Sequence, residues 1–188
     1  GGGTPSLISA QGYQWLFGQL KARLDFKADC EITLEANPGT VEHDPFADYL
    51  AVGINRLSLG VQSFDPEHLQ RLGRIHSANN ALDAIQQARQ AGFERVNVDL
   101  MHGLPQQTEE QALTDLKLAV EQGATHISWY QLTIEPNTVF FRTQPVLPQD
   151  ETLEHIQELG EAYLKANGYI NYEVSAWRKE KPSAHNLN

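Results

Sequence analysis

The sequence is poor in cysteine, in basic residues and in long apolar runs, and each shortage excludes a class of protein. Cys30 is the only cysteine, so the chain can form neither an internal disulfide nor a cysteine-ligated metal site by itself. No stretch reaches the ~20 apolar residues that a membrane-spanning helix needs. The 14 basic residues face 24 acidic ones, a net charge of −10, and they form no cluster of the kind that binds nucleic acid. A lone cysteine favours a reducing compartment, so we expect a cytoplasmic protein.

What is present describes one ordinary globular unit. The 188 residues are 40% hydrophobic and 20% charged, which suits a single folded domain. The chain opens on a glycine run and stops at residues 185–188 (HNLN) without a helix cap or a polar tail. We therefore expect residues 1–188 to be a fragment of a longer protein, truncated at both ends.

Strand and helix patterns alternate along the chain, which predicts an α/β fold with a parallel sheet and outer helices. An acid and a proline at Asp65 and Pro66 mark a helix start, and Thr108 with Gln111 has the spacing of a capping box. Five strands are too few for a closed eight-stranded barrel, so an open sheet or a partial barrel is expected. The predicted strands are 31–37, 54–62, 95–101, 126–133 and 172–177; the main predicted helices are 7–24, 44–52, 78–91, 108–122 and 151–167. The segment 136–149, with three prolines, is predicted to be a loop.

Polar residues recur at every second position of these strands. One face of the first strand carries Glu35, and one face of the third carries Asn97 and Asp99. The second strand contributes Ser58, Gly60 and Gln62, and the fourth is expected to contribute Gln131 and Thr133. Strands of a parallel sheet are normally apolar on both faces, and an unpaired buried carboxylate is costly. The pattern therefore predicts a polar ligand cavity at the carboxyl ends of the strands, or else an antiparallel sheet with a wet outer face.

Several further residues have a functional and a structural interpretation. Arg71 and Arg74, three positions apart on a predicted helix, could clamp a carboxylate or could simply face solvent. His102, beyond the third strand, could be a general acid or base, or a hydrogen-bonded structural residue. Trp129, Tyr130 and Tyr172 could stack on a planar ligand or pack in the core.

The two ends of the sequence offer weaker signals. The run Gly1–Gly3 matches no standard phosphate loop, but it would let backbone approach a ligand closely, or it could be a linker. His185 could ligate a metal or heme iron, although no second ligand is in view.

Five motifs spread along the chain together resemble one family. The sequence resembles the radical S-adenosylmethionine (SAM) superfamily, in its oxygen-independent coproporphyrinogen III oxidase branch. Two more segments, 129–138 (WYQLTIEPNT) and 185–188 (HNLN), are similar to the heme-chaperone type of that branch. The five motifs are 1–6 (GGGTPS), 35–40 (EANPGT), 56–64 (RLSLGVQSF), 72–76 (LGRIH) and 97–105 (NVDLMHGLP).

The resemblance implies a fold and a set of ligand contacts. The fold is a partial (βα)6 TIM-like barrel with its first βα unit missing from this chain. The resemblance has Arg74 pairing with the SAM carboxylate and Asp99 accepting hydrogen bonds from ribose hydroxyls, and it suggests His185 as a heme contact. The implied SAM-binding positions are Gly2, Gly3, Thr4, Glu35, Gln62, Arg74, Asp99 and Thr133.

One family feature is absent. The CxxxCxxC motif that holds a [4Fe–4S] cluster does not occur, and Cys30 is alone and in the wrong place. We expect the cluster motif upstream of Gly1, so that only the full-length protein binds the cluster.

The resemblance implies a protein that binds heme and transfers it to acceptor proteins, without coproporphyrinogen oxidase activity of its own. The acceptors could include membrane-associated proteins, although no transmembrane segment is predicted here. A second hypothesis is a true oxygen-independent coproporphyrinogen III oxidase. A third is a non-radical βα domain that binds a nucleotide or a sugar.

Overall fold

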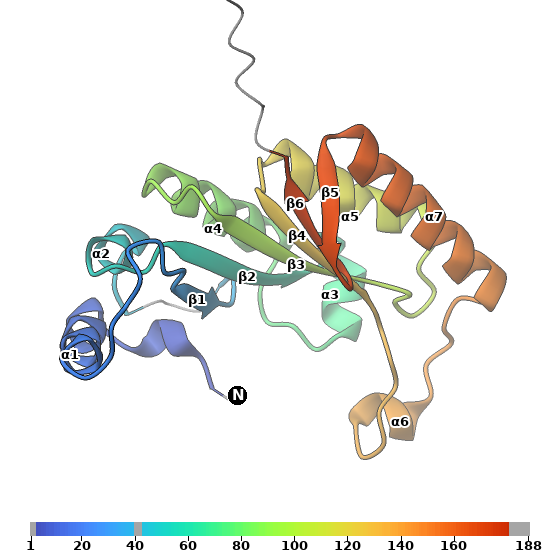
Figure 1. Cartoon of the computed structure of the whole chain (residues 1–188). Coiled ribbons are helices and arrows are strands. Elements are labelled where there is room, and N and C mark those ends of the chain that lie inside the picture. The colour runs from blue at the N-terminus through green and yellow to red at the C-terminus, as the bar shows by residue number, and fades with distance from the viewer. Residues whose placement is uncertain (1–2, 40–42, 181–188) are drawn as a thin grey trace, which may run out of the picture.

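A six-stranded sheet organises the computed structural model, which describes residues 3–39 and 43–180 (Figure 1). Its strands lie in the order β1-β2-β3-β4-β6-β5. Strands β1 to β4 are mutually parallel, and β6 runs antiparallel to both of its neighbours, β4 and β5. The parallel prediction is therefore confirmed for the first four strands, and the wholly antiparallel alternative is wrong. The strands are β1 (Thr33–Ala36), β2 (Arg56–Gln62), β3 (Val96–His102), β4 (His126–Gln131), β5 (Tyr169–Glu173) and β6 (Ala176–Lys179).

Several helices begin where the sequence places capping residues. The side chain of Ser9 accepts from the backbone N–H of Gly12 at the start of α1, and the predicted capping box of Thr108 and Gln111 begins α5. Asp65 caps α3, as its acid–proline pair indicated. The helical elements are the 3-10 turn η1 (Pro5–Leu7), α1 (Ala10–Lys21), α2 (Phe46–Ala51), α3 (Pro66–Arg71), α4 (Ala78–Gln90), α5 (Glu109–Glu121), α6 (Val139–Thr143) and α7 (Asp150–Ala166).

The strand order decides where the helices lie. Because β1 to β4 are neighbours in chain order, right-handed crossovers place every connecting helix on the same face of the sheet. Figure 1 shows α4, α5 and α7 along that face. The core forms between them, where Leu57, Val98 and Ile127 pack with Ile85 of α4 and Leu116 of α5. A doubly wound sheet would reverse its order and carry helices on both faces, so the winding is that of a partial TIM-like barrel, as predicted.

Three segments differ from the sequence prediction. The last predicted strand, 172–177, is wrong as a single element, because the chain turns at Val174 and Ser175 to form the β5–β6 hairpin. Ser175 takes a left-handed backbone conformation (φ 57°) there without any glycine, asparagine or proline to signal the turn. The loop 136–149 contains the short helix α6, and the first helix spans only Ala10–Lys21 after the separate turn η1.

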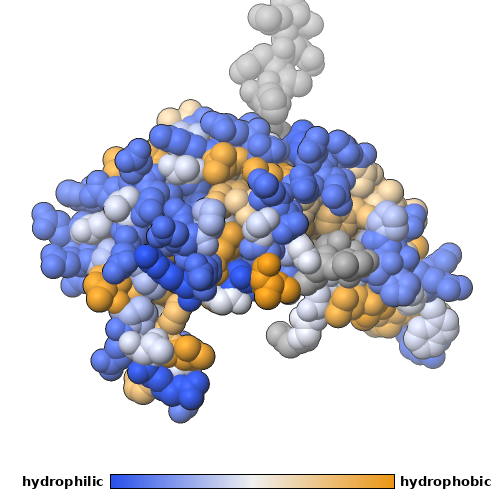
Figure 2. Space-filling view, turned by 180° about the vertical axis from the view of Figure 1, so that it is seen from behind, coloured by the Kyte–Doolittle hydropathy of each residue, from blue (hydrophilic) through white to orange (hydrophobic). Residues whose placement is uncertain are grey.

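The surface is mostly hydrophilic where Figure 2 displays it, with hydrophobic residues in smaller groups between the polar ones. This is the distribution expected of amphipathic helices that bury one stripe against a sheet. Within residues 3–39 and 43–180, no helix combines the length and the apolar character needed to cross a membrane.

Candidate functional site

The uncovered face of the sheet carries a row of polar side chains. Glu35 of β1 pairs in register with Ser58 of β2, and Ser58 pairs with Asn97 of β3. One level further along, Asp99 of β3 pairs with Ser128 of β4. Residues in register on neighbouring parallel strands project from the same face. We call these residues, together with Gln62 and Tyr130, the polar face.

Asn97 and Asp99 form the centre of the polar face. The Asn97 amide nitrogen lies 2.9 Å from Ser58 Oγ, 3.0 Å from Ser128 Oγ and 2.8 Å from Asp99 Oδ1. Ser58 Oγ also donates to Asp99 Oδ2 over 3.1 Å. Three strands therefore fix the orientation of a single carboxyl group.

Burial changes the pKa of that carboxyl. It raises the pKa of Asp99 above the ordinary value, although hydrogen bonds from Ser128, Ser58 and Asn97 act in the opposite direction. The charge of Glu35 raises this pKa further. The hydrogen bonds hold Asp99 as an oriented acceptor, the kind of group that binds hydroxyl groups of a ligand.

Gln62 joins the polar face from the end of β2. Its side chain is buried, and its Oε1 accepts a 2.8 Å hydrogen bond from Tyr130 Oη. A Cβ atom added at Gly60 would lie 2.8 Å from Asn37 Oδ1 and 3.2 Å from Gln62 Nε2. Glycine at position 60 therefore lets these side chains close over the strand.

Two contributors from β4 were missed in the sequence. The expected contribution of Gln131 is wrong in its alternation, because Ser128 and Tyr130 are the residues of this strand that reach the polar face. Thr133 lies beyond the end of β4, where strand alternation no longer applies. Gln131 instead approaches α7, since a Cβ at Gly103 would touch both Gln131 and Leu153 of that helix. The apolar residues Ile127 and Trp129 were the available signal, because they mark the opposite face.

The remaining predicted SAM positions come from several separate segments of the chain. Arg74 is exposed, and its charge lowers the pKa of the Tyr130 hydroxyl, which burial and Asp99 raise. Thr4 precedes η1, which packs beside β1, and its carbonyl accepts from the Leu7 N–H. Gly3 has φ 95°, and a Cβ there would meet no described atom within 4 Å. Thr133 is exposed beyond the end of β4. Gly2 and His185 lie outside the described residues.

Arg71 and Arg74 do not share a helix face, so that expectation is wrong. Helix α3 ends at Arg71, and Gly73 turns the chain with φ 69° before Arg74. Arg71 donates to the carbonyl of Pro105 over 2.7 Å and pairs with Glu67. Of the two arginines, Arg74 is the one whose charge acts on Tyr130 of the polar face.

His102 lies on the other face of the sheet. Its ring packs against Trp129 with 4.3 Å between centroids, and burial lowers its pKa to about 4. The ring of His102 is packed in the core, but it is not the hydrogen-bonded residue expected, because its Nδ1 has no hydrogen-bond partner among the described residues. The core interpretation of Trp129 is confirmed. Tyr172, in contrast, is exposed and meets the ring of His126 edge-on.

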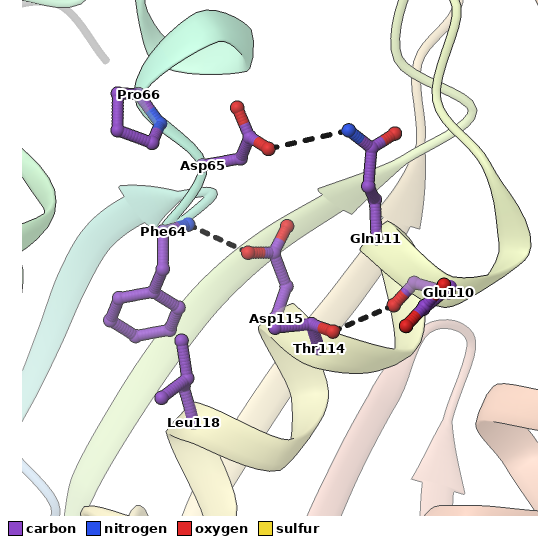
Figure 3. Close-up of a pocket in the computed structure, with 8 residues that line it drawn as sticks. All are labelled: Phe64, Asp65, Pro66, Glu110, Gln111, Thr114, Asp115 and Leu118. Carbon is purple, nitrogen blue, oxygen red and sulfur yellow. Dashed lines mark hydrogen bonds between the residues drawn. The ribbon is translucent and has the colours of Figure 1, made fainter.

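A separate hollow of about 310 Å³ opens between the start of α3 and α5 (Figure 3). At its base the buried Asp115 accepts hydrogen bonds of 2.7 Å from Ser63 Oγ and from the backbone N–H of Phe64. The hollow is therefore not part of the polar face, but it lies directly behind the residues that follow Gln62.

The donor sets distinguish two cofactors. Carboxylates, an amide and hydroxyls on one face suit the ribose and amino-acid groups of SAM. A [4Fe–4S] cluster needs three thiolates, whereas Cys30 is an isolated, exposed thiol ahead of β1. The described residues also contain no group of three histidine, cysteine or acidic side chains placed to hold a metal ion. The polar face therefore has the donor set that SAM requires, whereas the described residues offer no set of thiolates for the cluster.

Comparisons with known proteins agree with these features. The family profile described as "Radical SAM superfamily" matches residues 1–119. The heme chaperone HemW of Haemophilus influenzae is 52% identical and that of Escherichia coli 54%, each over the whole chain and over 49% and 50% of their own lengths. The chain thus spans about half of these relatives. In fold, it resembles the coproporphyrinogen III oxidase HemN of Escherichia coli with a TM-score of 0.84 at 28% identity, covering 97% of this chain and 43% of that one.

Proposed function

The chain belongs to the radical SAM superfamily, and from this premise we propose that it is the SAM-binding part of a HemW-type heme chaperone. The full-length protein would bind heme and pass it to acceptor proteins, in the cytoplasm. The identities of 52% and 54% to two proteins of that name support the proposal. Because those relatives are about twice as long, we propose residues 1–188 as a fragment of the core domain.

One observation carries the SAM site: Glu35, Gln62 and Asp99 converge on the polar face from three adjacent strands. We assign Asp99 to the ribose hydroxyls, since its carboxyl is held in place by three polar neighbours. Arg74 would pair with the ligand carboxylate. Gly2, Gly3 and Thr4 would meet its amino group, and Thr133 would add a further contact.

The iron–sulfur cluster is proposed for the full-length protein only. Its three thiolates would precede Gly1, and the chain 1–188 supplies no step of its chemistry. Heme contacts are proposed at His185, which lies outside the described residues.

The second candidate is an oxygen-independent coproporphyrinogen III oxidase, and the fold similarity to HemN favours it. The non-radical nucleotide- or sugar-binding domain has lost its support, because the chain belongs to the superfamily.

Calorimetry of the reconstituted full-length protein tests the SAM site. Asp99→Ala and Gln62→Ala should each weaken SAM binding by at least ~1–3 kcal/mol, because each removes a buried polar partner. Asp83→Ala, which removes an exposed acid of α4, is the matched control and should bind SAM normally. Unchanged affinity in both site variants would reject the placement of SAM on the polar face.

A turnover assay separates chaperone from oxidase. The full-length protein is incubated with coproporphyrinogen III, SAM and a reductant, and in parallel it is titrated with heme. The proposal expects stable heme binding and no product, whereas conversion to protoporphyrinogen IX would establish the oxidase instead.

A further inference from the structure

We infer that Asp115, on the helix-covered side of the sheet, is a positioning residue for the polar face: it holds the backbone that follows Gln62 and thereby presents the Gln62 side chain. The inference rests on the proposed SAM site, and it concerns a residue that touches no part of that site directly.

Gln62 has an unusual backbone. Its φ is 70°, a left-handed value that residues other than glycine adopt rarely and at an energetic cost. The N–H of Ser63 donates to the carbonyl of Val61 over 2.9 Å, so Gln62 is the central residue of a three-residue turn, a strained γ-turn. The pairing of β2 with β3 is irregular between Leu59 and Gln62. Such a turn persists only where neighbouring contacts impose it.

Contacts on both sides of Gln62 hold the turn in place. On the Val61 side, His76 Nε2 lies 3.0 Å from the same Val61 carbonyl. On the Phe64 side, Asp115 accepts from both Ser63 Oγ and the Phe64 N–H, each over 2.7 Å. Ser63 Oγ in turn accepts from the N–H of Asp65 over 3.0 Å. Figure 3 shows Asp115 of α5 directed at this backbone.

Burying the carboxyl group of Asp115 costs free energy, which indicates that this residue has a role other than packing. It is 2% exposed and lies on the stripe of α5 that buries Ala112, Leu116 and Ala119. Burial raises its pKa to about 7 despite the two hydrogen bonds. An apolar residue would be cheaper in this stripe, but it could not hold the Ser63–Phe64 backbone and so could not oppose the strain at Gln62.

Losing Asp115 has a defined consequence. The Phe64 N–H and the Ser63 hydroxyl would be left buried without their acceptor. The segment 61–65 would then relax out of the left-handed turn, and Gln62 would lose its alignment with Tyr130. Ligand affinity would fall through Gln62 alone.

A double-mutant cycle in the full-length protein tests this. SAM affinity is measured by calorimetry for wild type, Asp115→Asn, Gln62→Ala and the double variant. Each single variant should weaken SAM binding ~10-fold, in line with one lost buried hydrogen bond. The double variant should also lose only ~10-fold, because Asp115 has no effect left once the Gln62 side chain is gone.

A stability control separates positioning from general damage. Leu164→Ala creates a cavity under α7, a helix that packs against α5 and β5, and it should lower Tm without changing SAM affinity. Should Asp115→Asn fail to fold, Ser63→Ala removes one of the two hydrogen bonds to Asp115, together with the bond from the Asp65 N–H, and is expected to weaken SAM binding ~3-fold.

The outcomes are distinct. Normal SAM affinity in Asp115→Asn, with Gln62→Ala impaired, overturns the inference and leaves the SAM site intact. A ~100-fold loss in the double variant also overturns it, because the two residues would then act independently. Normal affinity in Gln62→Ala overturns the inference, and the SAM site itself is rejected only if Asp99→Ala also binds SAM normally.

Discussion

The two faces of strands β1 to β4 share a backbone but differ in the side chains that they carry. The helix-covered face is built from aliphatic and aromatic residues such as Leu57, Val98 and Trp129, which are almost completely buried. The polar face presents carboxylates, an amide and hydroxyls that bond mainly to one another. A protein built only for stability would bury both faces of a parallel sheet in apolar contacts. The difference indicates that one face holds the fold together and the other is kept for a ligand.

The largest expected effect tests the helix-covered face. Trp129→Ala should lower the free energy of unfolding by ~3–5 kcal/mol, because it removes a large core side chain. Gly160 of α7 packs directly on the indole ring, where an added Cβ would overlap it, so the helix has no side chain at this point to fill the space. Tyr130→Phe, the next residue and on the opposite face, should cost about 1 kcal/mol, for one hydrogen bond. Urea denaturation measures the free energy of unfolding of both variants. Equal losses would contradict the conclusion that the helix-covered face holds the fold together and the polar face is kept for a ligand.

A second prediction concerns acid stability on the same face. The pKa of His102 is about 4 in the folded chain and near 6.5 when unfolded. Between these values the unfolded chain binds the extra proton, so stability is fully present above pH 6.5 and falls as the pH drops to 4. The loss from this residue should be roughly 3 kcal/mol.

A variant tests whether this pH dependence of stability comes from His102. His102→Asn should remove from the pH dependence the part that this residue contributes, which urea denaturation of variant and wild type followed from pH 7 to pH 4 measures. An identical slope in His102→Asn and wild type would show that other groups cause it.

The smallest expected effect tests the polar face. Ser58→Ala removes a hydrogen bond that lowers the pKa of Asp99, whereas Glu35→Gln removes a charge that raises it. The two variants should therefore shift this pKa in opposite directions, upward for Ser58→Ala and downward for Glu35→Gln. Carboxyl-carbon NMR titration measures the shifts. Shifts of the same sign would mean that Glu35 and Ser58 do not both act on Asp99.

Local signals predicted the elements well. The alternation along β2 and β3 separated Ser58, Asn97 and Asp99 from their apolar neighbours, and the capping box at Thr108 fixed the start of α5. Prediction failed where a local signal was missing or ambiguous. Tyr172 to Trp177 reads as continuous strand although Ser175 turns it, and the expected contribution of Gln131 of β4 came from the wrong alternation.

The sequence by itself determined the βα order and which residues of β1, β2 and β3 are polar, because the alternation of side chains is a property of each strand alone. The ligand contacts implied by the resemblance all remain predictions, those of Gly2, Gly3, Thr4, Glu35, Gln62, Arg74, Asp99, Thr133 and His185. Only the tertiary structure decided that Tyr130 bonds to Gln62, that His102 belongs to the core, and that Asp115 supports the turn after β2. The contacts behind these three findings join residues that lie 27 to 68 positions apart in the sequence. Packing between elements fixes such contacts, and a local sequence pattern does not reveal them.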